Sequence, residues 1–90
     1  MFSRKPDEMI GLRLAMLRNS QELTQSVMAA VTDVSDATYK NYERSRRDPP
    51  TRFIQAVCTQ FKVNVAWLIE GRGEMYLAAS DDQADIDTST

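Results

Sequence analysis

Histidine is absent from this 90-residue chain, and cysteine occurs only once, at Cys58. A single thiol cannot form an internal disulfide, and without histidine the usual cysteine and histidine metal sites are excluded. Histidine, the commonest catalytic base, is thus missing, the single cysteine is expected to be buried, and no paired carboxylates mark a cleft. We therefore expect a protein that is not an enzyme and that needs no cofactor or metal.

Long apolar runs are missing too. No segment reaches the roughly 18 consecutive apolar residues of a membrane-spanning helix. Residues 1–6 include two basic residues, but no apolar run of signal-peptide length follows them. The sequence therefore predicts a soluble, cytoplasmic protein.

An excess of positive charge is lacking overall, because 11 basic and 13 acidic residues give a formal net charge of −2. Four of the acids, however, lie in the last ten residues, and 11 basic against 9 acidic groups remain in residues 1–77. Between Lys40 and Arg52 five basic residues stand against two acidic ones. Such a local patch suits a surface that faces phosphates.

The length supports one small domain. We expect residues 1–77 to form it and residues 78–90 to be a disordered acidic tail, because the tail has too few apolar side chains to fold. Its aspartates lack the glycine and the terminal glutamate of a calcium-binding loop, so we expect no metal there.

Two short helices joined by a tight turn stand at the centre of the sequence. Thr24 can cap a helix over residues 25–31, and Ser35 can cap a second that follows at once. Asp33 suits the turn between them because its short polar side chain tolerates the left-handed backbone better than most residues. Helices this short are marginal alone and must pack on a core.

Three further helices complete an all-α domain. Pro6 starts the first, over residues 6–19; Thr51 starts the fourth; and Asn64 caps the last, which Gly71 ends. Helical spacing predicts which side chains point inward: Ile10, Leu14 and Leu17, widened by Met9, Leu12 and Met16; Met28 and Val31; Val34, Tyr39 and Tyr42; Phe53 or Ile54, with Val57 and Phe61; and Val65, Trp67 and Leu68. Cys58 is expected to pack beside the core. Residues 73–77 are expected either to cover the core or to join a partner subunit.

The outward face of the second central helix carries Asp36, Ala37, Lys40 and Asn41. An amide, an ammonium, a carboxylate and a methyl suit the reading of base edges in a DNA major groove. Polar outer faces are also the rule on surface helices. From residue types alone, both interpretations stay open.

Five motifs in order link the chain to a known family: IGLRLAMLR at residues 10–18, LTQ at 23–25, VSDATYKNYER at 34–44, RRDP at 46–49 and VAWLIEG at 65–71. With these motifs the sequence resembles the lambda repressor and Cro-like (Xre-type) helix-turn-helix proteins. The resemblance implies a compact five-helix lambda-repressor-like DNA-binding domain, with the helix-turn-helix at helices 2 and 3. Residues 35–42 would be the recognition helix of a phage or prophage repressor. Asp33 and Ser45 depart from the glycines usual at those positions.

The resemblance also implies site residues. The base-reading positions match Asp36, Ala37, Thr38, Lys40 and Asn41, and the expected phosphate contacts are Gln25, Ser35, Arg44, Arg46 and Arg47. Asn41 suits adenine, Lys40 guanine and Ala37 a thymine methyl. Asp36 either accepts from a cytosine amine or only caps the helix and repels phosphate.

Two functions follow from these expectations. The first is a transcriptional regulator that binds a two-fold symmetric double-stranded DNA operator as a homodimer. The second is an antitoxin-like protein-interaction module of the same fold, for which DNA binding is secondary. Longer relatives continue into a dimerisation domain, so the chain is either a short regulator or a detached amino-terminal domain.

Overall fold

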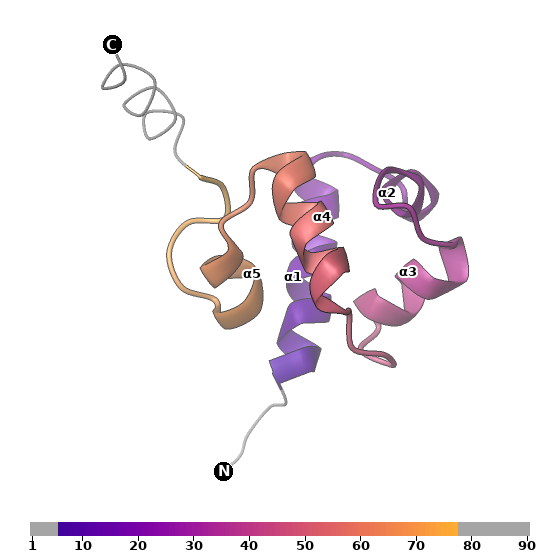
Figure 1. The fold of residues 1–90 in the computed structure, drawn as a ribbon, viewed down its shortest axis with the longest axis horizontal. Coiled ribbons are helices and arrows are strands. Elements are labelled where there is room, and N and C mark those ends of the chain that lie inside the picture. Colours follow the sequence, from indigo (N-terminus) through magenta and orange to yellow (C-terminus); the bar gives the residue numbers. More distant parts are fainter. Residues whose placement is uncertain (1–5, 78–90) are drawn as a thin grey trace.

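The computed structural model describes residues 6–77, and the predictions for residues 1–5 and for the acidic tail lie outside this range. Its described part is all-α, as predicted, with five helices in chain order: α1 (Pro6–Ser20), α2 (Gln25–Val31), α3 (Asp36–Glu43), α4 (Thr51–Phe61) and α5 (Val65–Glu70). In Figure 1, α1 lies between the α2–α3 pair on one side and α5 on the other. None of the helices in residues 6–77 is long and apolar enough to cross a membrane.

Side-chain caps start three of the helices. Thr24 Oγ1 accepts from the Val27 amide at 3.1 Å, and Ser35 Oγ accepts from the Thr38 amide at 3.1 Å. Asn64 Oδ1 accepts from the Ala66 amide at 3.1 Å. Each bond satisfies an amide that the first helical turn leaves unpaired. The predicted starts of α2, α3 and α5 are therefore confirmed.

The two turns that flank α3 both use a left-handed residue. Asp33 has φ 62° between α2 and α3, and Ser45 has φ 62° just after α3. Both are non-glycine residues in a conformation that glycine adopts more easily. The predicted turn at Asp33 is confirmed, and Ser45 adopts a similar backbone.

The core gathers one face of each helix. Leu14, Met28, Tyr39 and Leu68 are fully buried, and Phe53 lies between the two tyrosines of α3. The ring centroid of Phe53 is 4.7 Å from that of Tyr42 and 6.3 Å from that of Tyr39. Such tilted aromatic contacts add to the apolar burial. The prediction that both tyrosines are core residues is correct.

Four apolar side chains expected to point inward are instead 40% to 49% exposed: Leu12, Met16, Val31 and Val65. On α1 the core contacts the stripe through Leu14 and Leu17, and at 100° per residue Leu12 and Met16 lie on the far side of the helix. The prediction that these four side chains point inward is therefore wrong. Cys58 packs against the core as expected, and burial raises the pKa of its thiol.

Residues 73–77 cover the core, one of the two roles expected for them. Tyr76 forms an isolated antiparallel bridge with Val63, and Met75 and Tyr76 pack against the core cluster. The phenolic oxygen of Tyr76 also accepts a hydrogen bond from Gln21 Nε2 at 2.7 Å. This segment therefore ties the end of the described chain to the end of α1.

Candidate nucleic-acid interface

Helix α3 turns one face to the core and the other to solvent. Tyr39 and Tyr42 are buried, whereas Asp36 and Ala37 are exposed. Lys40 and Asn41 are partly exposed, so neither side chain is sealed inside the domain. At 100° per residue, Ala37, Lys40 and Asn41 share the outer face, and the exposed Asp36 lies at its edge. The structure thus brings together four of the five predicted base-reading residues.

The fifth, Thr38, lies at the margin of this face. Its side chain is half-buried, and its Oγ1 accepts a hydrogen bond from Ser35 Oγ at 2.9 Å. Ser35, expected to contact phosphate, is exposed and already serves as the N-cap of α3. Both hydroxyls are therefore engaged within the first turn of the helix.

Helix α2 holds α3 through its first two residues. Gln25 Nε2 donates to Glu43 Oε1 at 3.1 Å, and Ser26 Oγ donates to Asp36 Oδ2 at 2.6 Å. Asp36 is the first residue of α3 and Glu43 the last. Two neighbouring side chains of α2 therefore bond to carboxylates at the two ends of α3.

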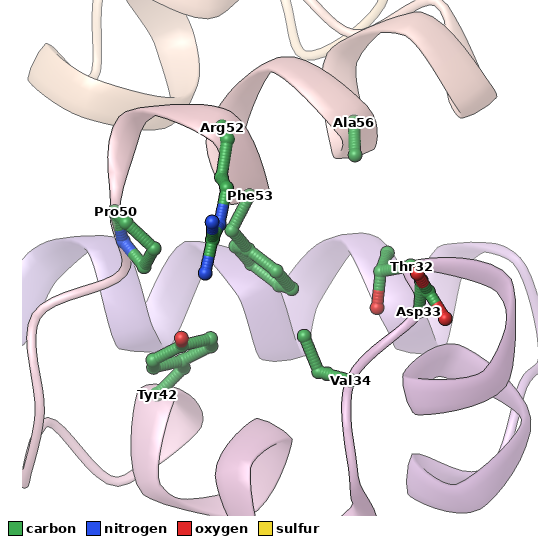
Figure 2. Close-up of a pocket in the computed structure, with 8 residues that line it drawn as sticks. All are labelled: Thr32, Asp33, Val34, Tyr42, Pro50, Arg52, Phe53 and Ala56. Carbon is green, nitrogen blue, oxygen red and sulfur yellow. The ribbon is translucent and has the colours of Figure 1, made fainter.

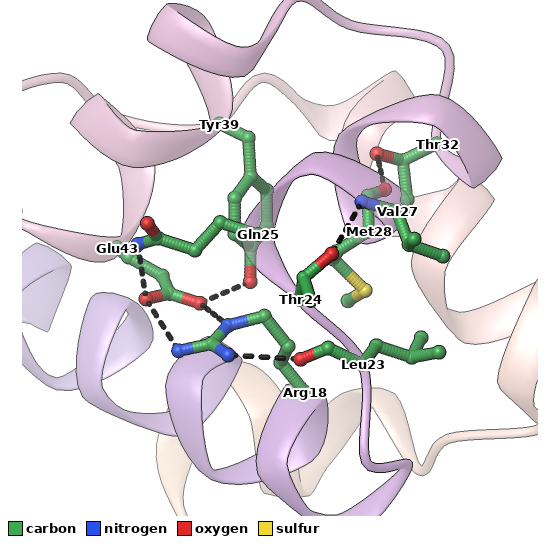
Figure 3. Close-up of polar contacts among 9 residues, drawn as sticks. All are labelled: Arg18, Leu23, Thr24, Gln25, Val27, Met28, Thr32, Tyr39 and Glu43. Atoms are coloured by element: carbon green, nitrogen blue, oxygen red, sulfur yellow. Dashed lines mark hydrogen bonds and ion pairs between the residues drawn. The ribbon is translucent and has the colours of Figure 1, made fainter.

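Glu43 is the centre of a polar cluster that joins three helices, drawn in Figure 3. Arg18 Nε donates to Glu43 Oε2 at 2.6 Å, the Tyr39 hydroxyl donates to the same oxygen, and Gln25 donates to the other. The Glu43 and Arg18 side chains are only 7% and 17% exposed. Charged partners this deeply placed favour each other strongly once both have left water.

Burial and hydrogen bonding act in opposite directions on the Glu43 carboxyl. Burial alone would raise its pKa, but hydrogen bonds from Arg18, Tyr39 and Gln25, with the charge of Arg18, bring the pKa below its ordinary value. Burial and the bond to Glu43 raise the pKa of Tyr39, which therefore keeps its proton as a donor. The cluster thus contains an ionised carboxylate surrounded by donors.

Three exposed arginines follow α3: Arg44, Arg46 and Arg47. Within residues 6–77 none of them forms an ion pair. The Arg46 amide donates to the carbonyl of Asn41 at 2.9 Å, which keeps the loop against the end of α3. The predicted cationic residues therefore follow directly on α3, and among residues 6–77 their charges have no ionic partner.

A groove of about 480 Å³ opens between α4 and the α2–α3 turn. Figure 2 shows the Arg52 side chain extending from α4 toward Tyr42, and Asp33 near the other end of the groove. Arg52 is exposed and adds a further cation near α3. Across residues 6–77 no cluster of three or more potential metal-ligating side chains occurs.

Sequence reasoning did not identify the pairing of Arg18 with Glu43 or of Ser26 with Asp36. The two residues of the first pair lie 25 positions apart in the chain, and those of the second pair lie 10 apart. No pattern in the sequence connects residues at these separations, so the two pairs could not be found from it. Gln25 was expected to contact phosphate, and the structure also bonds its side chain to Glu43 at the end of α3.

Comparison with known proteins shows a matching family and a similar solved structure. The family described as a helix-turn-helix domain matches residues 10–66. Among solved structures, the clp gene regulator ClgR from C. glutamicum is similar, with a TM-score of 0.67 and 23% sequence identity. That match covers 73% of this chain and 86% of the other. No curated protein matches the chain. At this identity the structural similarity concerns the fold.

Proposed function

This chain belongs to the helix-turn-helix domain family, and from that premise we propose that it is a sequence-specific DNA-binding transcriptional regulator that inserts α3 into the major groove. The observation that carries the proposal is the two-sided nature of α3. Tyr39 and Tyr42 anchor it in the core, while Lys40 and Asn41 remain accessible on its outer face. A helix held in this way can present side chains to base edges without losing its position.

The outer face has a distinct chemical partner for each base pattern. The Asn41 amide pairs with adenine, the Lys40 ammonium donates to guanine, and the Ala37 methyl meets the methyl of thymine. Thr38 and Asp36 complete the set, and Thr38 Oγ1, which accepts from Ser35, keeps its own hydroxyl hydrogen for donation to a base. Asn41 is assigned the main role in base reading because a two-pronged amide contact is the most selective of these.

Phosphate contacts are assigned to the groups that border α3. Arg44, Arg46 and Arg47 supply charge on one side, and their contacts orient the protein without reading sequence. Gln25 lies against Glu43, which uses one amide hydrogen, and the second can donate to a phosphate. Ser35, exposed at the start of α3, is assigned the remaining phosphate contact.

We further assign the chain to the phage or prophage type of repressor, acting as a homodimer on a two-fold symmetric operator. An eight-residue helix is only about 12 Å long and spans few base pairs, so one copy reads a short sequence. Two copies on half-sites about one helical turn apart would double the number of bases read. The exposed Val65 and Ile69 of α5, beside a groove that Ile10 and Ile54 also line, support association through an apolar surface.

Selection of bound duplexes from a random pool tests the proposal directly. We expect a recurring symmetric sequence, whose affinity falls steeply with salt at about −0.9 in log–log slope per phosphate contacted, for roughly three or four contacts in each subunit. No enriched sequence, or an affinity insensitive to salt, would overturn the proposal. That outcome would favour the protein-interaction module of the same fold.

A further inference from the structure

The hydrogen bond between Ser26 and Asp36 lies where the amino-terminal ends of α2 and α3 meet. Ser26 is the second residue of α2 and Asp36 the first of α3, and both side chains are exposed. The oxygen–oxygen distance of 2.6 Å is that of a strong bond from a hydroxyl to a carboxylate. The position of the Asp36 carboxylate is therefore defined by a residue from another helix.

Capping does not account for this carboxylate. The side chain that caps α3 is that of Ser35, which accepts from the Thr38 amide. One of the two roles expected for Asp36, that of a helix cap, is thus filled by its neighbour. A negative charge in the first turn still favours the helix, but that effect needs no fixed orientation of the side chain.

The bond from Ser26 changes what the carboxylate can offer. An exposed aspartate normally samples several rotamers, and a hydrogen bond from a second helix selects one of them. Ser26 occupies Oδ2, and within residues 6–77 no hydrogen bond reaches Oδ1. An ionised carboxylate only accepts hydrogen bonds. The pair therefore presents one oriented acceptor at the edge of the outer face of α3.

We propose that Ser26 is a specificity-determining positioning residue, which orients the Asp36 carboxylate to accept from the exocyclic amine of a cytosine. This inference rests on the proposed function. In the major groove guanine presents only acceptors and thymine an acceptor and a methyl, so both disfavour a carboxylate. Adenine has an amine, but its neighbouring N7 acceptor repels the charge, whereas cytosine presents its amine alone. A fixed single acceptor therefore selects cytosine.

The test measures base preference, because a bond that merely joined α2 to α3 would not alter it. The full chain is assayed on four duplexes that differ only at the base pair whose preference Asp36→Ala removes. We expect the unsubstituted chain to prefer cytosine there by about tenfold, Ser26→Ala to reduce that preference to about threefold or less, and Ser26→Thr, which keeps the hydroxyl, to restore it. Thr59→Ala, at an exposed position on α4, is the matched control and should leave the preference unchanged.

A second variant keeps the test decisive if Ser26→Ala folds poorly. Asp36→Asn preserves shape but adds a donor, and an amide pairs best with adenine, so the preferred base should change from cytosine to adenine. Full cytosine preference in either Ser26→Ala or Asp36→Asn would overturn the inference, as would a failure of Ser26→Thr to restore it. A chain that selects no duplex at all would instead overturn the proposed function, so the two failures are distinguishable.

Discussion

Arg18 of α1 donates from Nε to Oε2 of Glu43, the last residue of α3, at 2.6 Å. Arg18 Nη2 also reaches the other carboxylate oxygen, at 3.4 Å, and Nη1 donates to the carbonyl of Leu23 at 2.9 Å. The guanidinium therefore connects α1, the loop before α2 and the end of α3. The orientation of the recognition helix depends on a residue of α1 that faces no DNA in our proposal.

Replacing Glu43 by glutamine should destabilise the domain. The substitution removes the negative charge and leaves the largely buried Arg18 without its ionic partner, at a cost of about 3 kcal/mol in the free energy of unfolding. Urea denaturation followed by circular dichroism measures it. The control is Glu70→Gln, whose pair with Arg72 is 54% and 73% exposed and should contribute under about 1 kcal/mol. Equal losses in the two variants would contradict this expectation.

Lowering the pH should remove the contribution of the ionised Glu43 carboxylate to the free energy of unfolding. Because its pKa in the fold lies below its ordinary value of about 4.5, the folded state binds the proton less readily than the unfolded chain. This contribution is therefore present above the ordinary pKa and is lost as the pH falls through the lower, folded value. We would measure the unfolding free energies of the unsubstituted chain and of Glu43→Gln in urea at several pH values from 6 to about 3. The difference between the two should become smaller as the pH falls. A constant difference would show that the carboxylate's charge is not what stabilises the fold.

Asn41→Ala and Arg46→Ala should weaken DNA binding in different ways. Loss of the Asn41 amide should cost about 1–3 kcal/mol on the selected operator and relax the preference at one base pair. Loss of Arg46 should weaken all duplexes alike and reduce the salt slope by about 1. Titrations of operator and unrelated duplexes at several salt concentrations separate the two effects. If both variants behave identically, the assignment of base and phosphate roles is wrong.

Gly11→Ala should disturb the contact between α1 and the end of α3. A Cβ there would lie 2.6 Å from the Glu43 carbonyl oxygen and 2.8 Å from that of Tyr42, too close to backbone for either to remain in place. We expect a loss of about 1–3 kcal/mol in unfolding free energy. Affinity should also fall for all duplexes, since the loop that carries Arg46 must move. Asn19→Ala, at an exposed site on the same helix, is the control in urea denaturation; a Gly11→Ala protein of unchanged stability would refute the close contact.

Asp33→Gly should stabilise the turn of the helix-turn-helix. Asp33 holds φ at 62°, which costs a non-glycine residue about 1 kcal/mol, and part of the gain is offset by the greater freedom of glycine in the unfolded chain. We expect a net gain of about 0.5 kcal/mol, and a loss for Asp33→Val, since branched side chains fit this conformation poorly. Melting temperatures of the three proteins give their order of stability. If Asp33→Gly melts below the unsubstituted chain, the aspartate side chain itself stabilises the turn.

Local features of the fold were readable in the sequence. The caps at Thr24, Ser35 and Asn64 each bond to an amide within three residues, so they depend on neighbours in the chain. The outward Lys40 and the buried Tyr39 on α3 were likewise correctly placed, because a short helix between two turns has only one face left for the core.

The faces of the other helices were less predictable. Leu12, Val31 and Val65 are apolar and were expected to belong to the buried faces of their helices, yet they are exposed. Periodicity says that some face is buried, but where an apolar stripe is broad, the packing of neighbouring helices decides which part of it the core covers. Residues 73–77 had two possible roles for the same reason, until their packing on Val63 was seen.

By itself, the sequence determined the five helices, the side-chain caps of three of them and the polar outer face of α3, because hydrogen bonds and side-chain spacing within a few residues specify them. Only the tertiary structure decided that Arg18 meets Glu43 and that Ser26 meets Asp36. These contacts join different helices, and their geometry follows from how α1, α2 and α3 pack. A fold can thus be recognised from local patterns, whereas the direction in which its carboxylates point depends on partners that only packing brings near.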